Sequence, residues 1–278
     1  MSNLLLRPHA PDIEGCVLDI TPQSAGWQRV GFRVHHLSPG QVASGGEAER
    51  EACLVVLKGT ADIVVESHRF AGLGGRSSVF EDAAPGAVYA PAGAKFQIIP
   101  RDEVELAVCS APGEPGRTPR AIESADMPKV VRGRGTNTRH VRNVLPEDRS
   151  ADNLIVVEVI TPGGHWSSYP PHKHDTARPG KETALEETYY HRLNPSQGFA
   201  FQRVYTDDRD LDETMCVHDG DVVLVPRGYH PVGAAHGYDL YYLNVMAGPR
   251  RAWVIHNDPE HEWMLRDARS EGQTPGAA

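Results

Sequence analysis

The chain has 278 residues, 40% of them hydrophobic and 23% charged, with a formal net charge of −9. This negative balance argues against general nucleic-acid binding, which needs a basic face. The longest apolar runs, such as Leu54–Leu57, fall far short of the roughly 18 residues that span a bilayer, so we expect no membrane segment. The start of the chain lacks the basic and apolar regions of a secretory signal, and the cysteines form no CxxC pair, which predicts a cytoplasmic protein with reduced thiols.

Short β-branched and aromatic runs separated by Gly, Pro and Asp turns dominate the sequence. In the first half we expect strands over Leu54–Leu57, Ala61–Glu66, Ala87–Ala90, Phe96–Ile99 and Glu105–Cys109. In the second half we expect them over Leu154–Ile160, Leu185–His191, Phe199–Tyr205, Val222–Val225, Tyr238–Val245 and Arg251–Ile255. Strands at this spacing, without a long amphipathic helix, are typical of antiparallel β sandwiches and barrels. The sequence therefore predicts an all-β protein whose little helix is confined to short turns and to a tail beginning near Pro259.

The stretch from Ser110 to Arg142 interrupts this rhythm, and we place the domain connection there. It opens with alternating Pro and Gly, which is typical of a loop. Five basic residues then follow within a short stretch: Lys129, Arg132, Arg134, Arg139 and Arg142. They either form a solvated strap between domains or include one or two arginines that lean into a substrate pocket and bind an anion.

The two halves of the chain share a pattern of a glycine, an apolar strand and a Pro-x-Gly turn. The pattern runs from Gly86 to Lys95 in the first half and from Gly220 to His230 in the second. We infer a duplicated β domain in which Lys95 stands where the second copy has His230. The predicted organisation is a degenerate N-terminal domain, a connecting segment and a metal-binding C-terminal domain, over residues 1–112, 113–145 and 146–278.

The strongest local signal is a pair of histidines one residue apart, His172 and His174. In an extended segment, residues i and i+2 point to the same side, so both imidazoles can reach one metal ion. A later strand offers a carboxylate at Glu187 or its neighbour Glu186, and His230 follows the Pro-x-Gly turn. Three imidazoles and one carboxylate suit zinc, manganese, Fe(II), nickel or cobalt.

These elements resemble the two motifs of the cupin superfamily, small β-barrels with a metal ion on the barrel axis. Two details depart from the common cupin spacing: an insertion at residues 176–181, and a single residue between Gly228 and His230. The fuller wording resembles the 5-deoxy-glucuronate isomerase family, a bicupin family of myo-inositol breakdown that is related to the 4-deoxy-5-keto-uronate isomerases. The segments that carry this resemblance are Trp166–Asp175, Leu185–Tyr190, Gly198–Asp208, Asp221–Pro231 and Tyr238–Arg250.

The resemblance implies two tandem cupin-like barrels, of the double-stranded β-helix or jelly-roll type, and an intramolecular oxidoreductase. The implied reaction is an aldose–ketose isomerisation of 5-deoxy-D-glucuronate to 5-dehydro-2-deoxy-D-gluconate. The family's metal ligands fall on His172, His174, Glu187 and His230. Glu187 is favoured over Glu186 because strand alternation sends Glu186 to the opposite face. The implied cofactor is a divalent ion (zinc, manganese or iron), and the implied partner is a small uronate.

Four further side chains on the expected strands of this barrel are candidate catalytic residues: Tyr190, Gln202, Arg203 and Tyr242. Arg203 is our candidate for binding the uronate carboxylate, because a guanidinium can grip it with two parallel hydrogen bonds. A structural role is the alternative for each candidate: a tyrosine is often a half-buried strand residue, and an arginine is often solvated at a sheet edge. Lys173 is expected to point away from the ligands, and the acidic run from Asp207 to Glu213 is either a solvated turn or a source of a catalytic carboxylate.

Two other functions stay open at the level of sequence. The same ligands suit an Fe(II) dioxygenase, and the first half, which lacks the histidine pair, suits a non-catalytic sugar-acid-binding bicupin. We expect the first half to be structural, with a ligand site at Lys95 or a dimer contact as alternatives. A homo-oligomer is compatible with the sequence, and neither a general base nor a hydride shift is singled out.

Overall fold

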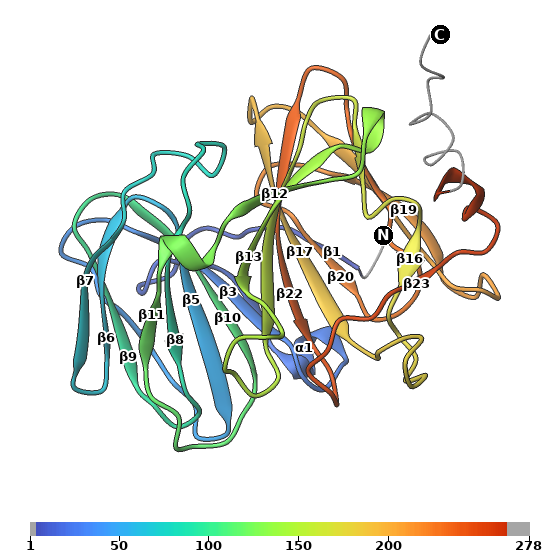
Figure 1. The fold of residues 1–278 in the computed structure, drawn as a ribbon. Helices are drawn as coiled ribbons and strands as arrows, with labels where there is room; N and C mark the ends of the chain where they lie inside the picture. The colour runs from blue at the N-terminus through green and yellow to red at the C-terminus, as the bar shows by residue number, and fades with distance from the viewer. Residues whose placement is uncertain (1–3, 266–278) are drawn as a thin grey trace, which may run out of the picture.

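The structure is a computed structural model that describes residues 4–265, and it consists almost entirely of antiparallel strands in two adjacent barrels (Figure 1). The described helices are short: α1 (Pro22–Ala25) and the 3-10 turns η1 (Ser124–Asp126) and η2 (Gly135–Asn137). A further helical turn covers residues 263–265, and the rest of the expected helical tail lies outside the described residues. The expectation of an all-β chain with two tandem barrels is confirmed. Among residues 4–265, no helix is long and apolar enough to cross a bilayer.

The first barrel is built from two sheets. The six-stranded sheet has the spatial order β11 (Arg120–Ile122), β8 (Gly86–Ala90), β5 (Arg50–Lys58), β10 (Val104–Pro112), β3 (Gly31–Leu37) and β2 (Cys16–Ile20). The four-stranded sheet has the order β4 (Ala43–Gly45), β9 (Phe96–Pro100), β6 (Thr60–Val65) and β7 (His68–Gly74).

The second barrel repeats this plan. Its larger sheet has the order β1 (Leu5–Leu6), β20 (Val222–Val225), β17 (Glu186–Asn194), β22 (Asp239–Ala247), β14 (Ile155–Thr161), β13 (Arg139–Leu145) and β12 (Lys129–Arg132). Its smaller sheet has the order β15 (Trp166–Ser167), β21 (Val232–Ala234), β18 (Ala200–Tyr205) and β19 (Asp212–Val217). A two-stranded ladder of β16 (His172–Lys173) and β23 (His256–Asn257) completes it.

The two larger sheets pack against each other through their outer faces. Strand β5 is therefore buried along nearly its whole length, because one face lines its own barrel and the other contacts the second barrel. This double burial explains the continuous apolar run Leu54–Leu57. A strand with one face exposed to solvent would instead alternate apolar and polar residues. One hydrophobic cluster spans the interface and the second barrel, and a separate cluster fills the first barrel.

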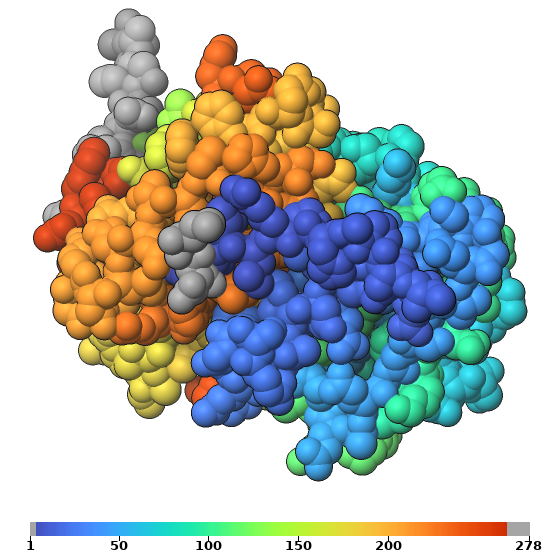
Figure 2. All heavy atoms as spheres, turned by 180° about the vertical axis from the view of Figure 1, so that it is seen from behind, coloured from blue at the N-terminus to red at the C-terminus, as the bar shows by residue number. Residues whose placement is uncertain are grey.

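The barrels also exchange strands, which changes the domain boundaries expected from the sequence. Strand β1, at the start of the chain, pairs with β20 of the second barrel, and β11 pairs with β8 of the first. In Figure 2 the dark blue N-terminal segment accordingly lies across the orange atoms of the second barrel. The expected connecting segment 113–145 is not a separate strap, because its second half forms β12 and β13 of the second barrel.

Most expected strands are present, with one clear exception. The segment Arg251–Ile255 is not a strand, and the next strand along the chain is β23, which begins at His256. The Arg251 guanidinium instead donates to the carbonyl oxygens of Leu154 and Glu147, both at 2.8 Å. The segment is thus fixed by its side chain, which strand periodicity does not reveal.

Candidate metal centre and active site

The first histidine of the pair lies in a short two-stranded ladder, and His174 follows directly after it. His172 belongs to β16, whose partner strand β23 supplies Asn257 opposite it. The carbonyl oxygen of His174 accepts a hydrogen bond of 2.8 Å from the backbone N–H of Leu185, which brings the beginning of β17 alongside. The histidine segment and the strand carrying Glu187 are therefore joined by backbone contacts, despite the insertion between them.

The third histidine is positioned by a tight glycine turn. Gly228 has a φ of +91°, and a Cβ there would lie 2.4 Å from the carbonyl oxygen of Tyr205, so only glycine fits. Nδ1 of His230 lies 2.9 Å from the carbonyl oxygen of Gly228. Because a carbonyl only accepts, Nδ1 carries the proton and Nε2 keeps a free lone pair that could bind a metal ion.

Three side chains converge on one buried point. Oε2 of Glu187 lies 3.1 Å from Nε2 of His174 and 3.3 Å from Nε2 of His230. All three side chains are at most 2% exposed, and within residues 4–265 these three atoms have no hydrogen-bond partner. Buried polar atoms that face one another unpaired are costly unless another group binds them. The donor set of two imidazoles and one carboxylate fits a divalent transition metal.

His172 lies beside this group and opens toward the cavity. Its ring centroid is 5.1 Å from that of His230 and 6.4 Å from that of His174, but its nitrogens lie outside the tight group of three. Burial lowers the pKa of both His172 and His230 to about 3. Both rings are therefore neutral near pH 7, which is the state that binds a metal ion.

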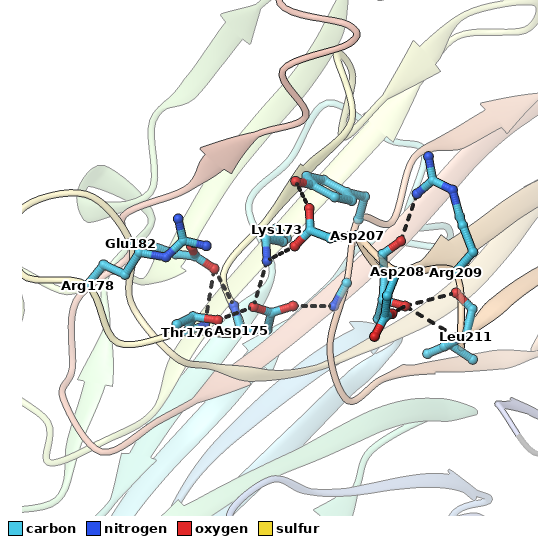
Figure 3. Close-up of polar contacts among 12 residues, drawn as sticks. Lys173, Asp175, Thr176, Arg178, Glu182, Asp207, Asp208, Arg209 and Leu211 are labelled. Atoms are coloured by element: carbon cyan, nitrogen blue, oxygen red, sulfur yellow. Dashed lines mark hydrogen bonds and ion pairs between the residues drawn. The ribbon is translucent and has the colours of Figure 1, made fainter.

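Lys173 points away from the ligands, as alternation predicts, into a polar network that joins the two ligand segments (Figure 3). Its ammonium donates to Asp207 at 2.7 Å and to Asp175 at 3.2 Å. The Asp175 carboxylate in turn accepts a 2.8 Å hydrogen bond from the N–H of Gly228. The network therefore links the neighbours of His172 and His174 to the turn that carries His230, and it fixes the spacing of the ligands.

A cavity of about 260 Å³ adjoins His172. The side chains that matter for its chemistry are Arg132, Arg139, His172, Tyr189, Tyr242 and Asn244. The rings of Tyr189 and Tyr242 lie 4.8 Å apart, and the Tyr189 hydroxyl is 2.8 Å from Oγ of Ser168. Burial raises the pKa of both tyrosines, so both hydroxyls stay protonated and can donate hydrogen bonds near pH 7.

Only part of the expected catalytic set reaches this cavity. Tyr242 lines it, whereas Gln202 does not line it and bonds through Oε1 to Nε2 of His191 at 2.9 Å. Tyr190 faces the opposite side of β17 and donates its hydroxyl to Glu105 of the first barrel at 2.8 Å. Tyr190 is thus a contact between the barrels rather than a residue of the cavity.

Arg203 also lies outside the cavity. Its guanidinium makes two 2.7 Å hydrogen bonds to Asp212 and lies 4.1 Å from the ring centroid of Tyr205. The expected role of Arg203 in carboxylate binding is therefore not supported by its position. Asp212 belongs to the acidic run, whose Asp210 pairs with Arg227 at 2.8 Å, so these two carboxylates are engaged by arginines.

Sequence reasoning missed Tyr189, although the signal was available. Alternation from Glu187 along the strand places Tyr189 on the same face as the ligand and Tyr190 on the other. Arg132 and Arg139 were recognised only as members of a basic stretch that either is solvated or leans into a pocket. Their places beside the cavity favour the second alternative.

The chain is similar to known proteins along nearly its whole length. The model of the KduI/IolB family matches residues 4–264. A 5-deoxy-glucuronate isomerase of Geobacillus kaustophilus is 52% identical over 95% of this chain and 96% of its own. The crystal structure of an IolB-like protein from Salmonella typhimurium LT2 superposes with a TM-score of 0.92 at 48% identity, over 95% of this chain and 100% of the other.

A more distant likeness concerns the fold alone. The oxalate decarboxylase of Lactobacillus farciminis aligns with a TM-score of 0.64 at 15% identity, over 99% of this chain and 97% of the other. The architecture of two barrels in one chain is therefore shared with proteins of quite different sequence.

Proposed function

Because the chain belongs to the KduI/IolB family, we propose that it is an isomerase that interconverts 5-deoxy-D-glucuronate and 5-dehydro-2-deoxy-D-gluconate. The observation that carries the proposal is the buried group of His174, Glu187 and His230 beside a cavity of sugar-acid size. The reaction would serve myo-inositol breakdown in the cytoplasm. A homo-oligomer stays a prediction.

The reaction requires a hydrogen to move from C2 to C1 and a hydroxyl proton to move from O2 to O1, with no net oxidation. A zinc, manganese or Fe(II) ion held by His174, Glu187 and His230, with His172 beside them, would supply Lewis-acid stabilisation of negative charge on the substrate oxygens. The neutral imidazoles of His172 and His230 and the unpaired carboxylate oxygen of Glu187 support this binding role.

The tyrosines orient the substrate. Tyr189 and Tyr242 present protonated hydroxyls side by side, and Ser168 bonds to the first of them. Such hydroxyls donate hydrogen bonds to sugar oxygens and stabilise the charge that develops on them. Trp253 and Ile255 also line the cavity, and their apolar surface reduces the water around the reacting carbons.

The decisive experiment is turnover of 5-deoxy-D-glucuronate followed by NMR of its C1 aldehyde proton. The metal-loaded protein should consume this signal and generate the ketose, whereas chelator-treated protein should be inactive until a divalent ion is returned. Full activity without metal would refute the metal role. Oxygen uptake with catechols or thiols, in the absence of uronate turnover, would instead support a dioxygenase.

A further inference from the structure

Two arginines at the cavity face each other without a carboxylate between them. Arg132 ends β12 and Arg139 begins β13, and the two residues are direct partners in the antiparallel ladder. Like charges at directly opposed positions destabilise a ladder. The pair is therefore a local cost to the fold unless an anion binds there.

Arg132 is exposed and Arg139 is half-buried, and their surroundings differ from those of Arg76, which is buried, and Arg192, which is half-buried. Arg76 pairs with Glu158 at 3.0 Å, and Arg192 pairs with Asp219 at 2.8 Å. Within the described part of the chain, no Asp or Glu carboxylate lies within 4.0 Å of Arg132 or Arg139. The contacts of the pair are a carbonyl oxygen, that of Asn137 at 3.2 Å from Arg139, and the ring of Trp253, whose centroid is 5.5 Å from the Arg132 guanidinium.

Both arginines line the cavity, so their positive charge faces it. Partial loss of water and the neighbouring charge of Arg139 lower the pKa of Arg132. Glu147, an acidic residue that lines the same cavity, accepts a hydrogen bond from the backbone N–H of Trp253 and makes no ion pair with the arginines.

We propose that Arg132 and Arg139 bind the carboxylate of the substrate, and so make the enzyme specific for sugar acids over neutral sugars. This inference rests on the proposed isomerase function. The cavity is lined both by the two arginines and by His172, whose ring centroid lies 5.1 Å from that of His230, so a single open-chain uronate can place its carbonyl end near the candidate ligands and its acid end at the guanidiniums. Two guanidiniums supply charge-assisted hydrogen bonds of the kind that grip a carboxylate. The pair takes the role that the sequence assigned to Arg203.

The test compares an acid and a neutral sugar on matched variants. Calorimetry with D-glucuronate and with D-glucose measures binding to the metal-loaded wild type, to Arg139→Gln, to Arg132→Gln and to Lys129→Gln. The last variant removes one positive charge from the same strand, where Lys129 pairs with Asp82 outside the cavity. We expect Arg139→Gln and Arg132→Gln to weaken glucuronate binding by about 10–100-fold, the worth of one hydrogen bond to a charged group, and to leave glucose binding unchanged. Lys129→Gln should behave like the wild type, and Arg139→Lys should recover part of the loss.

The binding assay separates this inference from the proposed reaction. If the wild type binds glucuronate no better than glucose, or if both arginine variants keep full affinity for the acid, the inference is overturned even when the isomerase activity is present. If the arginine variants lose acid binding selectively while the wild type does not isomerise 5-deoxy-D-glucuronate, the inference holds and the proposed reaction fails. Melting temperature and metal content of each variant show that it is folded, and either arginine variant alone suffices if the other does not fold.

Discussion

The two barrels have the same strand arrangement, but the side chains on their inner walls differ in polarity. In the first barrel Ala52 pairs with Ala90, and in the second Glu187 pairs with Val225 at the corresponding step of the ladder. Following these ladders outward gives a set of matched inner positions, first barrel before second: Ala52 and Glu187, Leu54 and Tyr189, Leu106 and Tyr242, Val108 and Asn244. These four polar residues of the second barrel thus have apolar counterparts in the first barrel.

The difference separates stability from chemistry. The inner residues of the first barrel form a continuous apolar cluster, whose burial stabilises the fold at about 25 cal/mol per Å². The second barrel instead buries polar atoms without hydrogen-bond partners, such as Oε2 of Glu187 and Nε2 of His230, and each such group costs about 1–3 kcal/mol. The second barrel therefore loses folding stability at its site, and the packing of the first barrel against the larger sheet of the second offsets this loss.

A pair of reciprocal contacts strengthens the joint between the barrels. The carboxylate of Glu51 accepts from three consecutive backbone N–H groups, at 2.6–2.7 Å, immediately before β14: those of Asp152, Asn153 and Leu154. The carboxylate of Glu186 accepts from three at 2.8–3.0 Å immediately before β3: those of Gln28, Arg29 and Val30. In the matched ladders Glu51 corresponds to Glu186, so each barrel clamps the other in the same way.

The largest effect is expected when a candidate ligand and its counterpart in the first barrel are each replaced in separate variants. His230→Ala should abolish isomerase activity and weaken metal binding by more than about 100-fold, because loss of an outer-shell partner alone costs about 10–100-fold. Lys95→Ala, at the repeat position of His230, should change neither property, because the Lys95 ammonium bonds to the carbonyl oxygen of Gly46 at the surface. Metal content and NMR turnover measure both. Loss of activity in Lys95→Ala would indicate a function in the first barrel.

The two clamps allow a sharper comparison, because only one of them adjoins a ligand. Glu186→Gln and Glu51→Gln should each lower the free energy of unfolding by about 2–4 kcal/mol, since each loses hydrogen bonds to a charged carboxylate. Only Glu186→Gln should also weaken metal binding, by about 10–100-fold, because Glu186 fixes the strand position of the adjacent Glu187. Denaturant unfolding and competition with a fluorescent zinc chelator measure the two effects.

Equal metal affinities of the two folded clamp variants would contradict this division of roles. The visible absorption of bound Co²⁺ provides a second reading, because it reports ligand geometry independently of turnover. We expect a changed spectrum in Glu186→Gln and the wild-type spectrum in Glu51→Gln.

A matched pair on the inner walls should separate stability from rate. Leu54→Ala leaves a cavity in the apolar cluster and should cost about 2–5 kcal/mol of stability, with activity per folded molecule unchanged. Tyr189→Phe removes one hydroxyl and should cost about 1 kcal/mol, while kcat falls by roughly 10-fold or more through loss of a hydrogen bond to the reacting oxygens. Thermal unfolding and steady-state kinetics measure the pair, and an unchanged kcat in Tyr189→Phe would exclude this role.

The comparison also explains which features the sequence could predict. The convergence of His174, Glu187 and His230 was predictable because i, i+2 spacing and the Pro-x-Gly turn are local patterns, and their role as metal ligands stays a prediction. The offset from Lys95 to His230 matches Glu51 with Glu186 and Ala52 with Glu187, as the ladders do, whereas an offset one residue longer would match Glu51 with Glu187. One residue exchanges the two faces of a strand, so a small error of alignment assigns an interface residue to the site.

Other features depend on contacts between distant segments and carry no local signal. Strand β1 pairs with β20, more than a hundred residues away, and β11 pairs with β8 across a long loop. The boundaries expected from the sequence therefore placed β1 in the first domain and β11 in the connecting segment. Tyr190 and Arg203 are ordinary strand residues in sequence, and only the partners Glu105 and Asp212 reveal their structural roles. Arg132 and Arg139 belong to a region of loop-like composition, yet the ladder of β12 and β13 directs both toward the cavity.

The smallest expected effect tests the outer wall of the second barrel. Arg203→Ala removes an ion pair with Asp212 in which both side chains are more than a third exposed, a kind of contact worth about 0–1 kcal/mol. We expect wild-type kcat and KM for 5-deoxy-D-glucuronate, because β18 turns Gln202 inward and Arg203 outward. Arg139→Gln should raise KM under the same conditions, so the two variants differ although each removes one guanidinium from the same barrel. A raised KM in Arg203→Ala would mean that the acid end of the substrate reaches the outer face, and the assignment of chemistry to the inner wall alone would then be wrong.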